Sequence, residues 1–256
     1  MNIKFQPVHL NNNPSFKAYP LAKYSYLHGE AKDIFVYQLE KRDVGFMKNL
    51  SENIDKFYKK HEVEDWSTKQ VMKEAIDAGV SILQSEKEDK AKVLMAFVDN
   101  EPSAILIGNI LKKDKNGNLH YSSRKNHSKD ETELDWLVTW NKKIFGEGKV
   151  IVSEFFHRVV KDGFKQIYVR SEVPEKSFAL EFYKKMGFKP LSDKQRKLQR
   201  KNDNNYLIGE YDVADDPVVP MKATIKDIRQ ALEKRSREMY REEIENPYSI
   251  DLMLKV

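Results

Sequence analysis

The sequence predicts an α/β protein of the α+β type, with a mixed, mostly antiparallel central sheet flanked by helices on both faces. Short apolar runs typical of strands alternate with amphipathic helical stretches in the middle of the chain. Before that alternation, two apolar runs are separated only by the turn Asp99-Asn100-Glu101-Pro102, which predicts a hairpin. The alternation and the hairpin together describe a mixed sheet covered by helices.

Each expected strand is rich in β-branched and aromatic residues, and each expected helix carries an apolar stripe at three- and four-residue steps. Phe46, Leu50 and Ile54 form such a stripe, and Thr224 with Asp227 resembles a capping box at the last helix. In chain order, the expected elements are a strand at 34–39, helices at 43–60 and 68–84, a hairpin of strands at 93–98 and 103–111, a strand at 132–139, a helix at 149–161, a strand at 166–170, a helix at 176–186, strands at 188–191 and 206–212, and a helix at 224–244.

Three segments are expected along the chain. Residues 1–32 are rich in Asn, Pro, Tyr and Lys without a sustained period, which indicates an N-terminal arm. Residues 33–213 form the main domain, and residues 214–256 form a C-terminal helical extension, which either docks on its own domain or pairs with a second copy in a homodimer. The polar insertion at 112–130 is either a long loop or a small extra hairpin.

Composition excludes several classes of function. The chain has no cysteine, which excludes disulfides and thiolate metal sites, and its six histidines show no ligand spacing, so no metal site is expected. No apolar run approaches the roughly 20 residues of a membrane span, and Met1 to Gln6 lack the layout of a secretion signal, so we expect a cytoplasmic protein. The net charge of +5 suits nucleic acid and an anionic small ligand equally.

A strand, a glycine-containing turn and a helix follow one another around Gly146 and Gly148. A phosphate group reaches backbone N–H groups only where no side chain intervenes, and the first amides of a helix have no partners within it. Lys143 and Lys149 flank the turn and add positive charge. The spacing alone is equally compatible with a pyrophosphate site and with an ordinary turn before a helix.

Two stretches of the chain resemble the GNAT N-acetyltransferase family, and the order of the expected elements from Ile34 to Asp212, about 180 residues, is also similar to it. Lys143-Ile144-Phe145-Gly146-Glu147-Gly148 is similar to the family's pyrophosphate signature, with Lys in place of Arg or Gln. The run 179–190, which contains Phe182-Tyr183 and Gly187-Phe188, is similar to its later signature. The resemblance implies a GNAT-like fold and acetyl-CoA as co-substrate. It implies contacts to acetyl-CoA from Leu137, Val138, Thr139, Lys143, Phe145, Gly146, Glu147, Gly148, Lys149, Ser177 and Phe182.

The resemblance further implies direct transfer of an acetyl group to a primary amine. Glu133 and Asp135, on one face of a strand, are candidates to accept the amine proton; the alternative is that they are solvated or ion-paired charges. Backbone N–H groups from Leu137 to Thr139 would stabilise the oxyanion if the strand is bulged and splayed from its neighbour. Tyr183 stands at the family's general-acid position. A phenol is protonated at neutral pH and can donate that proton. The alternative is that the Tyr183 ring only packs against the helix.

Two other functions compete with the enzyme. One is a binding module that keeps the acetyl-CoA pocket without catalysis, acting as a sensor or scaffold. The other is a nucleic-acid-associated protein that uses the basic run 194–201, although this run lacks interleaved aromatic residues and is typical of a solvated loop. The amine acceptor carries no recognisable signal in the sequence.

Overall fold

The computed structural model describes residues 18–27, 33–56, 66–84, 91–99, 101–109, 112–113, 119–120, 131–139, 146–172, 179–192 and 218–244. The chain divides into two compact units. The first comprises Met1–Ile107, Trp136–Glu154 and Ser236–Val256, and the second comprises Gly108–Asp135 and Phe155–Arg235. Strand β7 (Glu131–Thr139) and helix α4 (Glu147–Lys161) each contribute residues to both units.

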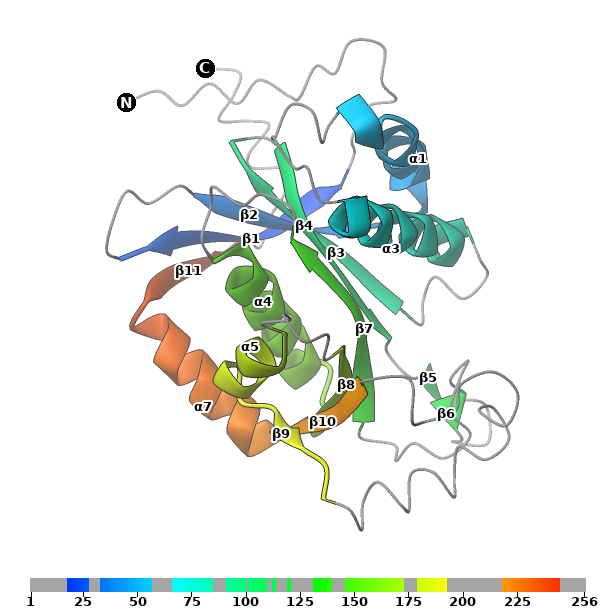
Figure 1. The fold of residues 1–256 in the computed structure, drawn as a ribbon. Helices are drawn as coiled ribbons and strands as arrows, with labels where there is room; N and C mark the ends of the chain where they lie inside the picture. The colour runs from blue at the N-terminus through cyan, green and yellow to red at the C-terminus, as the bar shows by residue number, and fades with distance from the viewer. Residues whose placement is uncertain are drawn as a thin grey trace, which may run out of the picture. The chain divides into compact units, whose positions relative to one another are not determined.

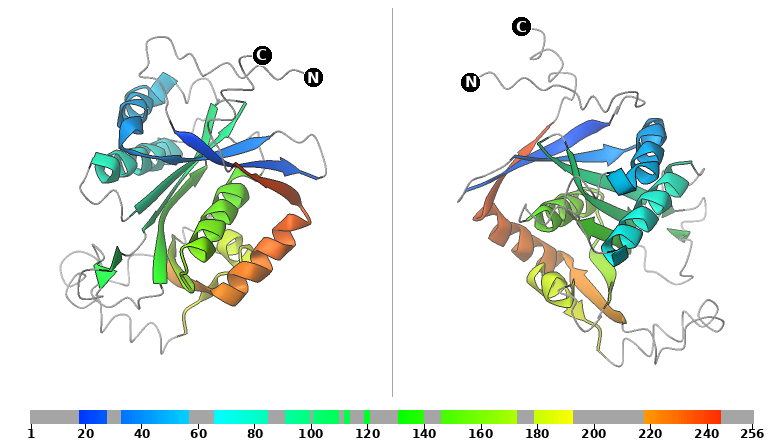
Figure 2. Two further views of the ribbon diagram at one scale, coloured as in Figure 1. Left: turned by 180° about the vertical axis from the view of Figure 1, so that it is seen from behind. Right: turned by 45° about the horizontal axis from the view of Figure 1, so that its top comes forward.

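The first unit is built on strands in the order β11-β1-β2-β3-β4 (Figure 1). Strand β1 pairs antiparallel with both β11 and β2, and β2 pairs antiparallel with β3. Figure 2 shows β1 lying between β2 and β11. The strands are β1 (Tyr19–Tyr26), β2 (Ile34–Leu39), β3 (Ala91–Val98), β4 (Glu101–Asn109) and β11 (Met239–Glu243).

Helices cover both faces of the strands of the first unit. On one face, α1 (Val44–Glu52) and α3 (Trp66–Gln84) enclose an apolar core that includes Met95 of β3. On the opposite face, Tyr24 is paired in register with Ile34 and its hydroxyl donates to Glu154 of α4 at 2.9 Å. The expectation of helices on both faces of the sheet is therefore confirmed.

The second unit contains the only parallel pair registered among the described residues. The first part of β7 runs parallel to β8 (Gln166–Glu172), while β10 (Val218–Thr224) pairs antiparallel with β8 and with β9 (Lys189–Pro190). Helices α5 (Ala179–Lys185) and α7 (Ile225–Ser236) complete the unit. With the antiparallel strands of the first unit, this confirms a mixed, mostly antiparallel sheet.

Both ends of the chain differ from the sequence-based expectation. The segment expected to be an arm contains β1, whose Ala22 and Tyr24 are buried and whose backbone pairs on one side with the next strand, β2, and on the other with β11, which is remote in sequence. The expected helix at 224–244 ends at Ser236, and the residues after it return as β11. Met239 continues a helical stripe in sequence, but pairing with β1 fixes its backbone as a strand.

Most central elements agree with the expectation. The hairpin is formed by β3 and β4, and the insertion holds a small two-stranded sheet of β5 (Lys112–Lys113) and β6 (Leu119–His120), which confirms the hairpin alternative. The capping box of α7 is present: the Asp227 amide donates to Thr224 Oγ1 at 3.3 Å, and the Thr224 amide donates to Asp227 Oδ2 at 3.0 Å. The expected strand at 206–212 lies outside the described residues.

Candidate functional site

Helix α4 begins at Glu147, directly after Gly146, whose φ is 110°. Its first backbone hydrogen bond runs from the Val150 N–H to the Gly146 carbonyl, at 2.9 Å. The amides of Gly148 and Lys149 precede that donor, so they have no acceptor within the helix, while the Glu147 amide donates to its own carboxyl group. They lie at the positive end of the helix dipole, which makes this helix start receptive to an anion.

Gly146 is required at this position by sterics as well as by its φ. A Cβ atom on Gly146 would lie 1.6 Å from Oη and 2.5 Å from Cζ of Tyr26, at the end of β1. No other residue type fits so close an approach, and a left-handed φ also favours glycine. The close contact with Tyr26 gives this glycine a packing role whether or not an anion binds beside it.

Glu147 is a buried carboxyl group in the first turn of α4, with only 3% of its surface exposed. Burial raises the pKa of Glu147 to about 8, against the opposing effect of a hydrogen bond from its own backbone N–H. The carboxyl group is therefore largely neutral at pH 7. Its Oε1 atom is buried and has no hydrogen-bond partner within the described part of the chain.

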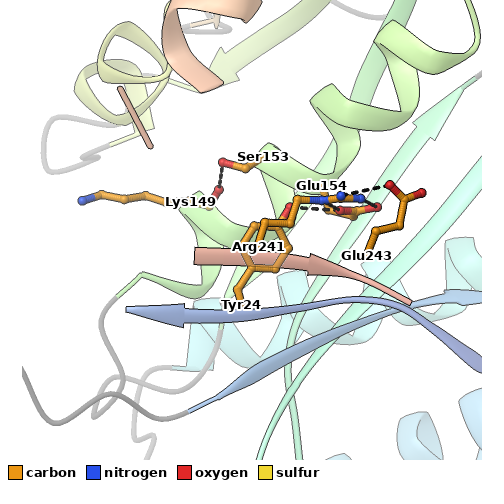
Figure 3. Close-up of polar contacts among 6 residues, drawn as sticks. All are labelled: Tyr24, Lys149, Ser153, Glu154, Arg241 and Glu243. Carbon is orange, nitrogen blue, oxygen red and sulfur yellow. Dashed lines mark hydrogen bonds and ion pairs between the residues drawn. The ribbon is translucent and has the colours of Figure 1, made fainter. Parts of the chain in front are cut away.

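Further along the helix, a polar cluster around the buried Glu154 joins α4 to the sheet (Figure 3). Glu154 is fully buried, and it accepts from Tyr24 of β1 and from Nε of Arg241 of β11, both at 2.9 Å. Arg241 also donates through Nη2 to Glu154 at 3.3 Å and through Nη1 to Glu243 at 3.1 Å. Burial and the neighbouring Glu154 charge raise the pKa of Tyr24 far above its ordinary value.

The cluster, defined as Tyr24, Glu154, Arg241 and Glu243, holds the N-terminal half of α4 against β1 and β11. Sequence reasoning missed it, because Tyr24 was assigned to an arm and Arg241 to a helix. The available signal was Glu154 itself, a charged residue in the apolar stripe of α4 between Ile151 and Phe155. A buried charge needs a partner, so that residue already indicated an unassigned cation nearby.

The three expected cofactor residues of β7 lie at its C-terminal end. Leu137 is half-buried, Val138 is buried and Thr139 is exposed. They follow Leu134, the last residue of β7 registered with β8. Because the Val138 side chain belongs to the apolar core beneath α1 and α3, the backbone is what this residue can offer to a ligand. The expected bulge and its N–H groups remain a prediction.

Glu133 and Asp135, the two candidate bases, lie in the second unit and differ in burial. Glu133 is 3% exposed and stands between buried Thr132 and Leu134, whereas Asp135 is exposed. The solvated-charge alternative therefore fits Asp135 and does not fit Glu133. Burial near a site is a common way to tune a general base, although structural ion pairs are buried too.

Tyr183 and Phe182, in α5 of the second unit, take part in aromatic packing. The Tyr183 ring is buried and meets Phe182 edge-on with 5.4 Å between centroids, and Phe188 edge-on at 5.5 Å. These contacts match the packing alternative for Tyr183. Its role as a proton donor remains a proposal.

Several expected residues lie outside the described part of the chain, namely Lys143, Phe145, Ser177 and the basic run 194–201. Within the described residues, no three His, Asp or Glu side chains are grouped so that they could share a metal ion. Among the helices described, none is both long enough and apolar enough to cross a membrane.

A pocket of about 640 Å³ lies between α1 and α3 of the first unit. Its walls carry both signs of charge, and Asp77 in it accepts from Ser51 at 2.6 Å and pairs with Lys73 at 2.5 Å. The mixed charge favours neither a cationic nor an anionic occupant. The lining residues are Lys48, Ser51, Glu52, Lys73, Asp77, Val80, Ser81 and Gln84.

No family profile matches the sequence, and no curated protein matches it. Solved structures do resemble the fold. An uncharacterized protein from Bacillus halodurans is similar with a TM-score of 0.50 at 13% identity, over 85% of this chain and 99% of that chain. At this identity, the likeness shows the fold alone.

More distant likenesses include two proteins whose descriptions give an activity. FdhC, described as a nucleotide-linked sugar GNAT in its apo form, is similar with a TM-score of 0.48 at 14% identity, over 87% of this chain and 99% of that one. The PaiA N-acetyltransferase from Thermoplasma acidophilum, solved in complex with coenzyme A, is similar with a TM-score of 0.45 at 14% identity, over 75% of this chain and 98% of that chain. Likenesses this distant assign no function. The mixed, mostly antiparallel sheet with helices on both faces agrees with the fold class that the sequence predicted.

Proposed function

We propose that this chain is a GNAT-type acyltransferase that binds acetyl-CoA at the start of α4 and transfers the acetyl group to a primary amine. The start of α4 carries the proposal: a left-handed glycine is followed, after Glu147, by the amides of Gly148 and Lys149, which have no acceptor within the helix. This feature coincides with the stretch Lys143 to Gly148 that resembles the family's pyrophosphate signature.

The residues at the helix start suit a pyrophosphate group. The amides of Gly148 and Lys149 offer donors at the positive end of α4, and Gly146 removes the side chain that would block access. Lys149 adds a cation whose side chain is 40% exposed, with Nζ 3.9 Å from Glu238. The cluster around Glu154 keeps the helix that carries these donors in place.

The proposed chemistry forms a bond between the amine nitrogen and the acetyl carbon, while the carbon–sulfur bond breaks. The amine proton goes to Glu133 or Asp135, directly or through water, and Tyr183 returns a proton to the departing sulfur. Backbone N–H groups of Leu137 to Thr139 stabilise the charge that develops on the acetyl oxygen. These roles come from the resemblance, and the burial of Glu133 makes it the preferred base.

The test combines calorimetry with turnover. We expect folded protein to bind acetyl-CoA, and to release free CoA when a panel of primary amines is added. Tyr183→Phe keeps the ring that packs against Phe182 and Phe188 but removes the proton donor. It should lower turnover roughly 100-fold, the range of general acid catalysis, with the acetyl-CoA affinity unchanged. If well-folded protein takes up no acetyl-CoA, the proposal fails.

A non-catalytic acyl-CoA-binding module is the second candidate, and the aromatic contacts of Tyr183 favour it. Binding of acetyl-CoA without release of CoA for any amine in the panel would support this candidate over the enzyme. A cytoplasmic location and a homodimer remain proposals from the sequence under either function.

A further inference from the structure

The Glu147 carboxyl group lies at the amide end of α4. Its own backbone N–H donates to the carboxyl group, so the side chain turns back toward the helix start. The residue is 97% buried, being 3% exposed, and its Oε1 has no hydrogen-bond partner among the residues described. One carboxyl oxygen is therefore satisfied by the first amide of the helix, beside the two amides that would receive an anion, and the other oxygen is not satisfied.

A buried carboxyl group in this setting is a neutral acid with a proton to donate. Burial disfavours the charged form, and the pKa of Glu147 is raised to about 8. A neutral carboxylic acid carries one O–H donor, and a buried donor without an acceptor is costly. An anion at the start of the helix would supply that acceptor.

We propose that Glu147 is a ligand-binding residue whose carboxylic acid donates a hydrogen bond to a phosphate oxygen of the acyl-CoA at the start of α4. The inference rests on the proposed function and adds a side-chain contact to the backbone contacts. A carboxylate in the same place would instead repel the phosphate, so binding depends on the proton of Glu147.

The neighbouring titratable groups already have other partners. On α4, Lys149 lies beside Glu238, which precedes β11, and Glu154 is bound by Tyr24 of β1 and Arg241 of β11. Tyr26 of β1 contacts Gly146 and is the further titratable group that the described residues place at this end. A phenol changes charge near pH 10, so a transition near pH 8 reports Glu147.

Calorimetric titration with acetyl-CoA between pH 7 and pH 9.5 tests the proposal, because acetyl-CoA has no free thiol to ionise. For the wild type, we expect constant affinity up to about pH 8 and then a loss approaching tenfold per pH unit. Glu147→Gln retains a donor and should bind within about threefold of wild type at pH 7, with no loss at higher pH. Glu147→Ala lacks the donor and should bind roughly 10- to 100-fold more weakly at pH 7.

Glu242→Gln, at an exposed carboxylate of β11, is the matched control and should keep the wild-type pH profile. Thermal unfolding of each variant separates weak binding from misfolding. Equal or tighter binding by Glu147→Ala would overturn the proposal, because the carboxyl group would then obstruct the anion. Identical pH profiles for wild type and Glu147→Gln would also overturn it. Wild-type protein that binds no acetyl-CoA at any pH would instead refute the proposed function itself.

Discussion

Single residues at the start of α4 combine structural and ligand-binding demands. Gly146 must be glycine because of both its φ of 110° and the approach of Tyr26. Glu147 is buried next to amides that suit an anion, so its charged form would oppose the proposed ligand and its neutral form would not. The proposed site therefore depends on the absence of a side chain at Gly146 and on the proton of the adjacent Glu147.

Gly146→Ala should destabilise the fold and abolish high-affinity binding of acetyl-CoA, because the new methyl group overlaps the Tyr26 phenol. Gly163→Ala is the matched control: its φ is 81°, but nothing lies within 4 Å of the added Cβ. Backbone strain in Gly163→Ala should lower the free energy of unfolding by about 1–2 kcal/mol, and Gly146→Ala should lower it clearly more. Chemical unfolding measures both, and equal costs would show that the contact with Tyr26 is unimportant.

The raised pKa of Glu147 also predicts a pH-dependent stability. Between its ordinary pKa near 4.5 and about 8, the folded state holds a proton that the unfolded state lacks. The free energy of unfolding should therefore fall by up to about 1.4 kcal/mol per pH unit as pH rises through this window, and level off above it. Urea unfolding at pH 6 and pH 9 should show Glu147→Gln gaining stability relative to wild type. A difference that does not change with pH would contradict the assignment.

At the scale of elements, the junction of α4 with β1 and β11 depends on a buried ion pair. Such a pair contributes little net stability relative to apolar residues, but removing one partner leaves the other charge buried. Sequence-distant elements are thus joined by Glu154, whose two main partners come from β1 and β11.

Arg241→Met should lower the free energy of unfolding by about 3 kcal/mol or more, because Glu154 then loses its cation while fully buried. Adding Glu154→Gln to that variant should recover much of the loss, since the uncompensated charge is gone. Glu243 is the more exposed partner of Arg241, so Glu243→Gln should lower the free energy of unfolding by about 0.5 kcal/mol or less. Denaturant unfolding of the three variants tests this order, and an Arg241→Met variant as stable as Glu243→Gln would refute it.

At the scale of the whole molecule, the two ends of the chain complete the first unit. Strand β11 comes after α7 in sequence and pairs with β1, five register pairs from Ala22↔Glu243 to Tyr26↔Met239. Residues Met239–Glu243 are therefore part of the sheet that supports α4.

Removal of residues 237–256 should expose the edge of β1 and deprive Glu154 of Arg241, so we expect a loss of stability at least as large as for Arg241→Met. Removal of residues 245–256 leaves β11 intact and is the control. Hydrogen exchange of the β1 amides and thermal unfolding check the comparison. Equal behaviour of the two truncations would mean that β11 contributes nothing to the unit.

The sequence by itself determined the central elements and the helix start, because these depend on local patterns. The apolar stripe of α3, the turn between β3 and β4 and the capping box of α7 are written in neighbouring residues. Gly146 was identified for the same reason, through its position before a helix, whereas Glu147 was named only through the family resemblance.

Only the tertiary structure decided which remote residues meet. Strand β1 has a weak pattern of its own, and β11 continues a helical stripe, so long-range pairing overrides local preference in both. The cluster of Tyr24, Glu154 and Arg241 joins residues up to 217 positions apart (241 − 24), which no local pattern encodes. The neutral state of Glu147 likewise follows from burial, a property of the packed chain and not of the glutamate alone.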